Sequence, residues 1–202
     1  MKNCKEPENQ TTRRILLIAC ATTLAVAFTV ALPQPAHAAD PVPNNIKVPR
    51  RNQAFLEAHA VGTQNYICLP SGWTFFGPQA TLFDDLNEQV ITHFLSSNPD
   101  ERGTARATWQ DSQDTSAIWA MSIESSSNPD FVAEGAIPWL LLLVVGAQDG
   151  PTGGNTLTAT TFIQRVNTIG GTAPSTGCTL STDVGKKALV PYVADYVFYK
   201  AD

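Results

Sequence analysis

The chain has 202 residues and a formal net charge of −5, and charged residues make up 15% of it. Beyond residue 38, its basic residues gather nowhere except in the pairs Arg50-Arg51 and Lys186-Lys187. This acidic balance without a basic cluster argues against nucleic acid or an anionic membrane surface as a partner. Low charge, frequent threonine, glycine and proline, and aromatic residues within short apolar runs indicate a β-rich domain.

Residues 1–38 have the pattern of an export signal. An Arg-Arg pair at positions 13 and 14 precedes an apolar stretch over residues 15–32, and an Ala-His-Ala triplet ends at Ala38. A basic head, an apolar middle and a small-x-small end are what the export machinery and signal peptidase recognise. We therefore expect cleavage after Ala38 and a secreted or periplasmic location, with 164 residues remaining, enough for one domain.

Three alternatives remain for this leader. The paired arginines, one spacer and two apolar residues also fit a twin-arginine signal, which would export the folded protein. The apolar stretch of 18 residues is just long enough for a membrane anchor. Cys20 ends a segment that resembles a lipoprotein box, although the apolar run before it is short. The peptidase pattern favours cleavage, and after leader removal no stable membrane span is expected.

The first half of the mature chain is predicted to hold a linker and four short strands. Residues 39–57, with two prolines near their start, are predicted to form an N-terminal linker, and residues 58–202 a β-rich domain. Alternating side chains, turn residues and short apolar runs predict the first strands at residues 59–68, 73–76, 82–83 and 90–95. Polar residues 84–88 predict a hairpin connection, and residues 96–104 a loop.

The second half continues the strand pattern. The expected strands are residues 108–109, 117–123, 156–168 and 189–200. In the last of these, Tyr192, Ala194, Tyr196 and Phe198 are expected on one face and the residues between them on the other. Residues 137–145 are the most apolar run of the mature chain and predict a central strand or a short helix, too short to span a bilayer. Eight to ten short strands predict a mainly β fold with little helix, namely a single-domain β-sandwich or a partly closed barrel.

Two cysteines remain once the leader is removed, Cys68 and Cys178. An exported protein with two cysteines most simply joins them in a disulfide, here between residues 110 positions apart. The alternative is a pair of buried free thiols. Because the mature chain has two histidines and lacks any close spacing of ligands, we expect no metal site. The absence of a G-x-G-x-x-G motif leads us to expect no cofactor.

A small set of residues forms the candidate site. His93, within a predicted strand, is the candidate general base, and its alternative is a structural histidine. Gln64 and Tyr66 share a strand face with Cys68 and are candidate binding residues, with hydrogen bonding to neighbouring strands as the alternative. Trp109, Trp119 and Trp139 could together form an aromatic platform for a sugar, although tryptophans in a domain of this size mostly belong to the core. Asp111 is the candidate carboxylate beside His93.

Arg165 and Asp195 are predicted to form a structural ion pair. Each lies in a strand with apolar residues on both sides, so each charge is expected to be partly buried. A buried charge is costly unless it is paired. The alternative for Arg165 is a side chain that points to solvent or contacts a ligand.

These observations favour an exported, non-enzymatic β-domain that binds a small molecule, a glycan or an envelope component. The alternative is a small hydrolase-type enzyme centred on His93. The second alternative is a structural or interaction module without a ligand. A cavity that holds His93 beside a carboxylate would favour the enzyme, and a flat aromatic strip would favour glycan binding.

Several segments together resemble family 3455 of domains of unknown function, found in exported bacterial and fungal proteins. They are residues 62–68, 136–142, 162–171 and 190–199, with the cysteine at position 178. The resemblance implies cysteines at both positions and so supports the disulfide. Where the family reads His-aromatic-x-Gly-Pro-x-Trp, this chain has an insertion between His93-Phe94 and Thr108-Trp109, which implies an altered site. A malate dehydrogenase label on some relatives gains no support, because the nucleotide fingerprint is missing.

Overall fold

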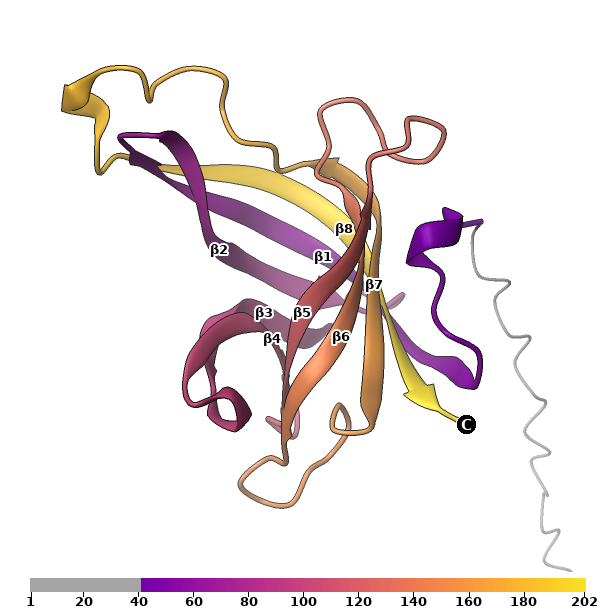
Figure 1. Cartoon of the computed structure of the whole chain (residues 1–202). Helices are drawn as coiled ribbons and strands as arrows, with labels where there is room; N and C mark the ends of the chain where they lie inside the picture. The colour runs from indigo at the N-terminus through magenta and orange to yellow at the C-terminus, as the bar shows by residue number, and fades with distance from the viewer. Residues whose placement is uncertain (1–40) are drawn as a thin grey trace, which may run out of the picture. The chain divides into compact units, whose positions relative to one another are not determined.

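The structure is a computed structural model that describes residues 41–202, all within one compact unit. The predicted export signal, with its cleavage site after Ala38, lies outside the described residues. Eight antiparallel strands follow one another in chain order and close into a barrel (Figure 1). They are β1 (Asn52–Leu69), β2 (Gly72–Phe83), β3 (Gln89–Asn98), β4 (Thr104–Asp111), β5 (Ala117–Ser126), β6 (Trp139–Gln148), β7 (Thr160–Gly170) and β8 (Lys187–Ala201).

Helix within the described residues is limited to three short 3-10 turns. They are η1 (Asn44–Ile46), η2 (Pro99–Glu101) and η3 (Ser181–Asp183). No helix in this part of the chain is long and apolar enough to cross a membrane. The prediction of a mainly β domain with little helix is confirmed, and the sheet closes on itself instead of stacking as a sandwich.

Several element boundaries differ from the sequence prediction, and two of these differences change the arrangement of the first strands. The expected strands 73–76 and 82–83 are parts of one strand, β2, because β1 pairs with it along its length from Gly72 to Phe83. β1 begins at Asn52, inside the stretch 39–57 expected to be a linker. Asn52 pairs with Ala201 at the far end of β8, so this start depends on a partner distant in sequence.

Small residues on β1 face large ones on β8 inside the barrel. The alternation of β8 turns Tyr192, Ala194, Tyr196 and Phe198 inward, and all four are buried. Across from them, β1 presents Ala58, Ala60 and Gly62. A Cβ at Gly62 would lie 2.2 Å from the backbone oxygen of Gln79 on β2. Glycine at this position therefore permits the close approach of β1 and β2.

One end of the barrel is filled by apolar side chains. Leu82, Ile91, Ile118 and Phe198 are each fully buried there, and all belong to one core cluster. Leu157, from the β6–β7 connection, joins the same cluster, and its backbone N–H donates to Ser116 Oγ. This packing closes one end of the barrel and restricts any internal space to the remainder.

A second core lies on the outer face of β6 and β7. Trp139, Leu141 and Val166 pack there with Ile46 of η1. Gln164 holds η1 against this outer face, since its Nε2 donates to the backbone oxygen of Ile46 at 2.7 Å. The segment before β1 therefore buries outward-facing apolar residues that would otherwise contact water.

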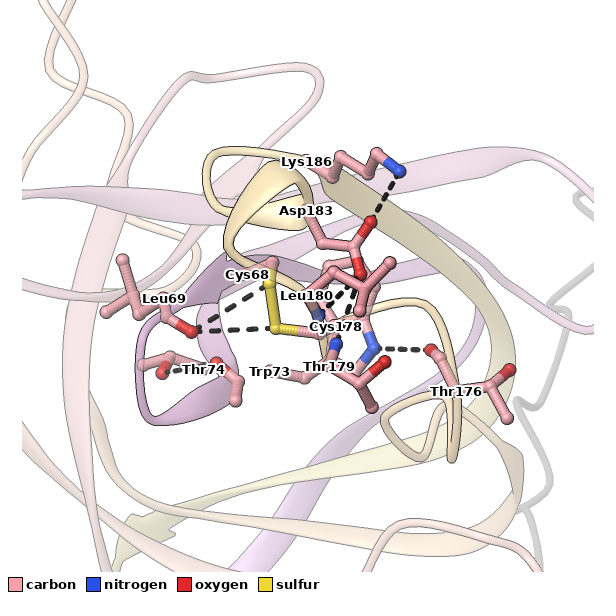
Figure 2. The surroundings of a disulfide bond; sticks show 11 residues. Cys68, Leu69, Trp73, Thr74, Thr176, Cys178, Thr179, Leu180, Asp183 and Lys186 are labelled. Carbon is pink, nitrogen blue, oxygen red and sulfur yellow. Dashed lines mark hydrogen bonds and ion pairs between the residues drawn. A yellow bond between two sulfur atoms is a disulfide. The ribbon is translucent and has the colours of Figure 1, made fainter.

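The predicted disulfide joins Cys68 to Cys178, with a Cα–Cα distance of 5.5 Å (Figure 2). Cys68 lies near the end of β1, and Cys178 lies in the long connection between β7 and β8. Trp73 Nε1 also donates to the Thr176 oxygen, and Asp183 accepts from Lys186 Nζ (Figure 2). This connection is therefore tied to the β1–β2 hairpin by a covalent bond and a side-chain hydrogen bond.

Replacing Cys178 by serine should lower the free energy of unfolding by about 2–5 kcal/mol, because the bridge restrains a long loop in the unfolded chain. Urea unfolding of the oxidised wild type and of Cys178→Ser measures the difference. The double variant Cys68→Ser/Cys178→Ser should unfold at the same midpoint as the reduced wild type. A single variant with the oxidised wild-type midpoint would contradict a stabilising bridge.

Candidate functional site

The barrel wall opens between β2 and β3. These two strands pair from Ala80↔His93 to Phe83↔Gln89, and beyond His93 they diverge. Pro78 lies on β2 just where the pairing with β3 ends, and a proline cannot donate to a ladder. A surface cavity of about 330 Å³ lies at this opening. The opening therefore results from the short ladder between β2 and β3.

An inner cavity of about 190 Å³ adjoins the opening. Pro78, His93 and Leu95 line both cavities, so the two spaces meet at these side chains. The apolar part of the inner wall comes from five strands and consists of Phe75, Pro78, Leu95, Ala107, Ala120, Leu140 and Leu142. The polar part consists of Gln64, His93, Trp109, Ser122, Arg165 and Tyr196. The cavity thus combines an apolar lining with a few polar groups, as small-molecule sites do.

His93 is a buried, neutral histidine in this wall. Its ring stacks on Trp109 with centroids 4.1 Å apart and tilts against Tyr196 at 5.3 Å. Nδ1 lies 2.8 Å from the Thr108 carbonyl oxygen, which can only accept, so Nδ1 carries the proton and Nε2 the lone pair. Burial lowers the pKa of His93 to about 3, and the charge of Arg165 lowers it further in the same direction. At neutral pH the ring is uncharged.

Three buried N–H groups in the wall lack an acceptor among the described residues: Gln64 Nε2, Trp109 Nε1 and Arg165 Nε. Gln64 is 3% exposed and Trp109 1%. Burial raises the pKa of Tyr192 and the nearby Gln64 side chain lowers it, yet Gln64 Nε2 forms no hydrogen bond of good geometry with an acceptor among the described residues. Arg165 is anchored elsewhere, since its Nη2 donates to the Pro138 oxygen at 2.7 Å.

The structure brings together part of the set expected from the sequence. Gln64, His93 and Trp109 line the inner cavity. Tyr66 is on the same strand as Gln64, and its hydroxyl donates to the Gly171 oxygen at 2.7 Å. Asp111 does not line the cavity, because its Oδ1 accepts two backbone N–H groups of the β4–β5 connection. Among the described side chains that line the cavity, none is an aspartate or glutamate.

The predicted ion pair of Arg165 with Asp195 is wrong. In the β7–β8 ladder, Val166 is opposite Asp195, and Arg165 is opposite Tyr196. Neighbouring positions on a strand point to opposite faces. Arg165 therefore turns inward with Tyr196, and Asp195 turns outward.

Asp195 has other partners on the outer face of the barrel. His59 Nδ1 lies 2.7 Å from its Oδ1, and Asn167 Nδ2 donates to its Oδ2 at 2.9 Å. His59 Nε2 also contacts Asp85 at 3.0 Å. Hydrogen bonds to Asp195 and then to Asp85 raise the pKa of His59. The pKa values of the two histidines among the described residues are therefore shifted in opposite directions, that of His59 upward and that of His93 downward.

Sequence reasoning missed most of the apolar wall. Phe75, Leu95 and Leu140 are ordinary strand residues, and nothing in their local pattern marks them as cavity residues. A signal existed for Arg165, which shares a strand face with Ile163, a fully buried core residue. That alternation places the charge inside the barrel once the inner face of β7 is known.

The free energy of unfolding should fall as the pH decreases from 6.5 to 4.5, by up to about 1.4 kcal/mol per pH unit, because unfolded His93 takes up a proton that folded His93 excludes. His59 does not interfere. Its raised pKa gives stability that is fully present below about pH 6.5 and is lost as the pH rises through its folded pKa. Urea unfolding across this range should show a weaker dependence for His93→Gln and an unchanged one for His59→Gln. If the free energy of unfolding depends on pH equally in wild type and His93→Gln, the lowered pKa of His93 is contradicted.

The sequence pattern of the family described as "Protein of unknown function (DUF3455)" matches residues 49–200. The matched segment begins just before β1 and ends within β8, so it contains the cavity and the disulfide. No curated protein and no solved structure matches the chain. The match covers most of the sequence, and the chain therefore belongs to the DUF3455 family.

Proposed function

We propose that this protein binds one small molecule inside its barrel. The observation that carries the proposal is the inner cavity of about 190 Å³ beside an opening in the wall between β2 and β3. Eight-stranded barrels have an interior that side chains can fill or that holds one small ligand. Here apolar side chains fill one end, and the cavity occupies space beside His93 and Trp109.

The volume limits the size of the ligand. A dry protein cavity of about 150 Å³ accommodates benzene. A cavity of about 190 Å³ therefore suits one ring, or a branched chain of similar bulk, with a small substituent. A longer ligand would extend into the surface cavity at the opening.

Binding is better supported than the alternatives raised by the sequence. The three tryptophans considered for a sugar platform, Trp109, Trp119 and Trp139, are all buried, which does not favour a flat glycan-binding strip. A general base works best when its pKa is near the operating pH, and a pKa of about 3 makes His93 a weak one. A purely structural module gives no reason for polar groups around an internal space.

Filling the cavity should abolish binding. Ala120→Leu adds bulk at a buried wall position, and Ala147→Leu makes the same change at an exposed position on β6. Benzyl alcohol and benzoate are suitable probes of the right size. At ten times the dissociation constant, a bound probe should raise the Tm of wild type and Ala147→Leu by roughly 3–6 °C. Ala120→Leu should show no shift, and a wild type that responds to neither probe would overturn the proposal.

We further propose that the protein works outside the cytoplasm. A disulfide is compatible with this, because disulfides persist in oxidising compartments. Intact-mass analysis of the exported protein should give a chain that begins at Ala39, as the Ala-His-Ala triplet predicts. Replacing the arginine pair at positions 13 and 14 by lysines tests the twin-arginine route. An exported chain that retains residues 1–38, or carries a lipid on Cys20, would contradict the expected cleavage.

A further inference from the structure

Three buried hydrogen-bond donors in the wall of the inner cavity have no acceptor in the described part of the chain. Gln64 Nε2, Trp109 Nε1 and Arg165 Nε are buried and lack an acceptor among residues 41–202. All three side chains line the same cavity. A buried donor without an acceptor is unfavourable, and such groups in native proteins are rare. Three of them around one space indicate that the missing acceptors belong to a ligand.

The cavity also carries an uncompensated positive charge. An arginine guanidinium stays protonated in proteins, and within the described chain the ion pairs go to Arg106, Lys186 and His59. Arg165 has a carbonyl, that of Pro138, as its hydrogen-bond acceptor. His93 adds no second charge, because burial keeps its ring neutral. One negatively charged group in the cavity would therefore neutralise the charge of Arg165.

We propose that the ligand is a small monocarboxylate with an apolar, ring-sized body, an inference that rests on the proposed function. Its carboxylate accepts from Arg165, Trp109 and Gln64. Two carboxylate oxygens offer about four acceptor positions, enough for three donors. The body packs against the apolar wall, which includes Phe75, Leu95, Ala107, Ala120, Leu140 and Leu142.

A carboxylate fits this site better than a phosphate does. Phosphate carries more oxygens and more charge near neutral pH, and the cavity supplies one formal positive charge. Oxygens directed at the apolar wall would lose their hydration without gaining a donor. A guanidinium pairs with carboxylate and with phosphate, so the single charge and the apolar wall decide between the two anions.

Titration calorimetry at pH 7 with the purified exported protein tests this assignment. The probes are sodium benzoate, benzyl alcohol and inorganic phosphate. Benzoate should bind the wild type at least about tenfold more tightly than benzyl alcohol, since charge-assisted hydrogen bonds are about twice as strong as neutral ones. Phosphate should give no binding and should not displace benzoate.

Three variants remove the anion preference in different ways. Gln64→Glu removes one donor and places a fixed carboxylate beside the other two, and Arg165→Gln removes the positive charge. Each should lower benzoate affinity at least about tenfold and change benzyl alcohol affinity less than about threefold. Trp109→Phe removes a single donor and should weaken benzoate binding by a smaller factor. Gln53→Glu, the same change at an exposed position of β1, should bind like the wild type.

The outcomes separate this inference from the proposed function. If benzyl alcohol binds and benzoate binds no more tightly, the carboxylate assignment fails and binding inside the barrel stands. If phosphate binds as tightly as benzoate, the site is a general anion site and the assignment also fails. If neither benzoate nor benzyl alcohol binds, both proposals fail. If Arg165→Gln unfolds, retained benzoate affinity in Gln64→Glu still overturns the assignment.

Discussion

The pairing of β1 with β8 is the constraint on which the rest of the structure depends. It runs from Asn52↔Ala201 to Ile67↔Lys187 and joins the first strand of the barrel to the last. Without it the sheet would have two free edges, and the inward faces of both strands would contact water. The pairing sets the small residues of β1 against the tyrosines of β8, and this brings Gln64 and Tyr196 to one cavity. Because the two strands are distant in sequence, closure is expected to be a slow step of folding.

Local pattern predicted much of the fold. The alternation within residues 189–200 correctly separated the two faces of β8, because side chains alternate along any strand. The bridge between Cys68 and Cys178 was predictable because residues 41–202 contain no other cysteine. The choice between a sandwich and a closed barrel could not be made in this way, because closure depends on pairing between β1, including residues 52–57, and β8.

The candidate site was predictable in part. Gln64 and His93 were identified as polar candidates in strands and Trp109 as an aromatic one, and the barrel gathers all three around one space. Arg165 was recognised as a buried charge, but a strand with apolar residues on both faces does not show which face is inside. The predicted pairing of Arg165 with Asp195 was based only on their opposite charges. The register between β7 and β8 places the two side chains on opposite faces of the sheet. The wall between β2 and β3 opens where their pairing stops, and sequence gives no measure of ladder length.

The opening between β2 and β3 also affects whether copies of the protein can associate by pairing their strands. Where β2 and β3 diverge, each strand has an unpaired side on which a strand of another molecule could be added. Pro78 lies next to this stretch of β2 and has no backbone N–H. A strand added there would therefore lack one backbone hydrogen bond. Lys187, which lies over the Phe76 ring at 5.5 Å, adds a positive charge near the same stretch. The opening between β2 and β3 is thereby a poor template for fibre growth.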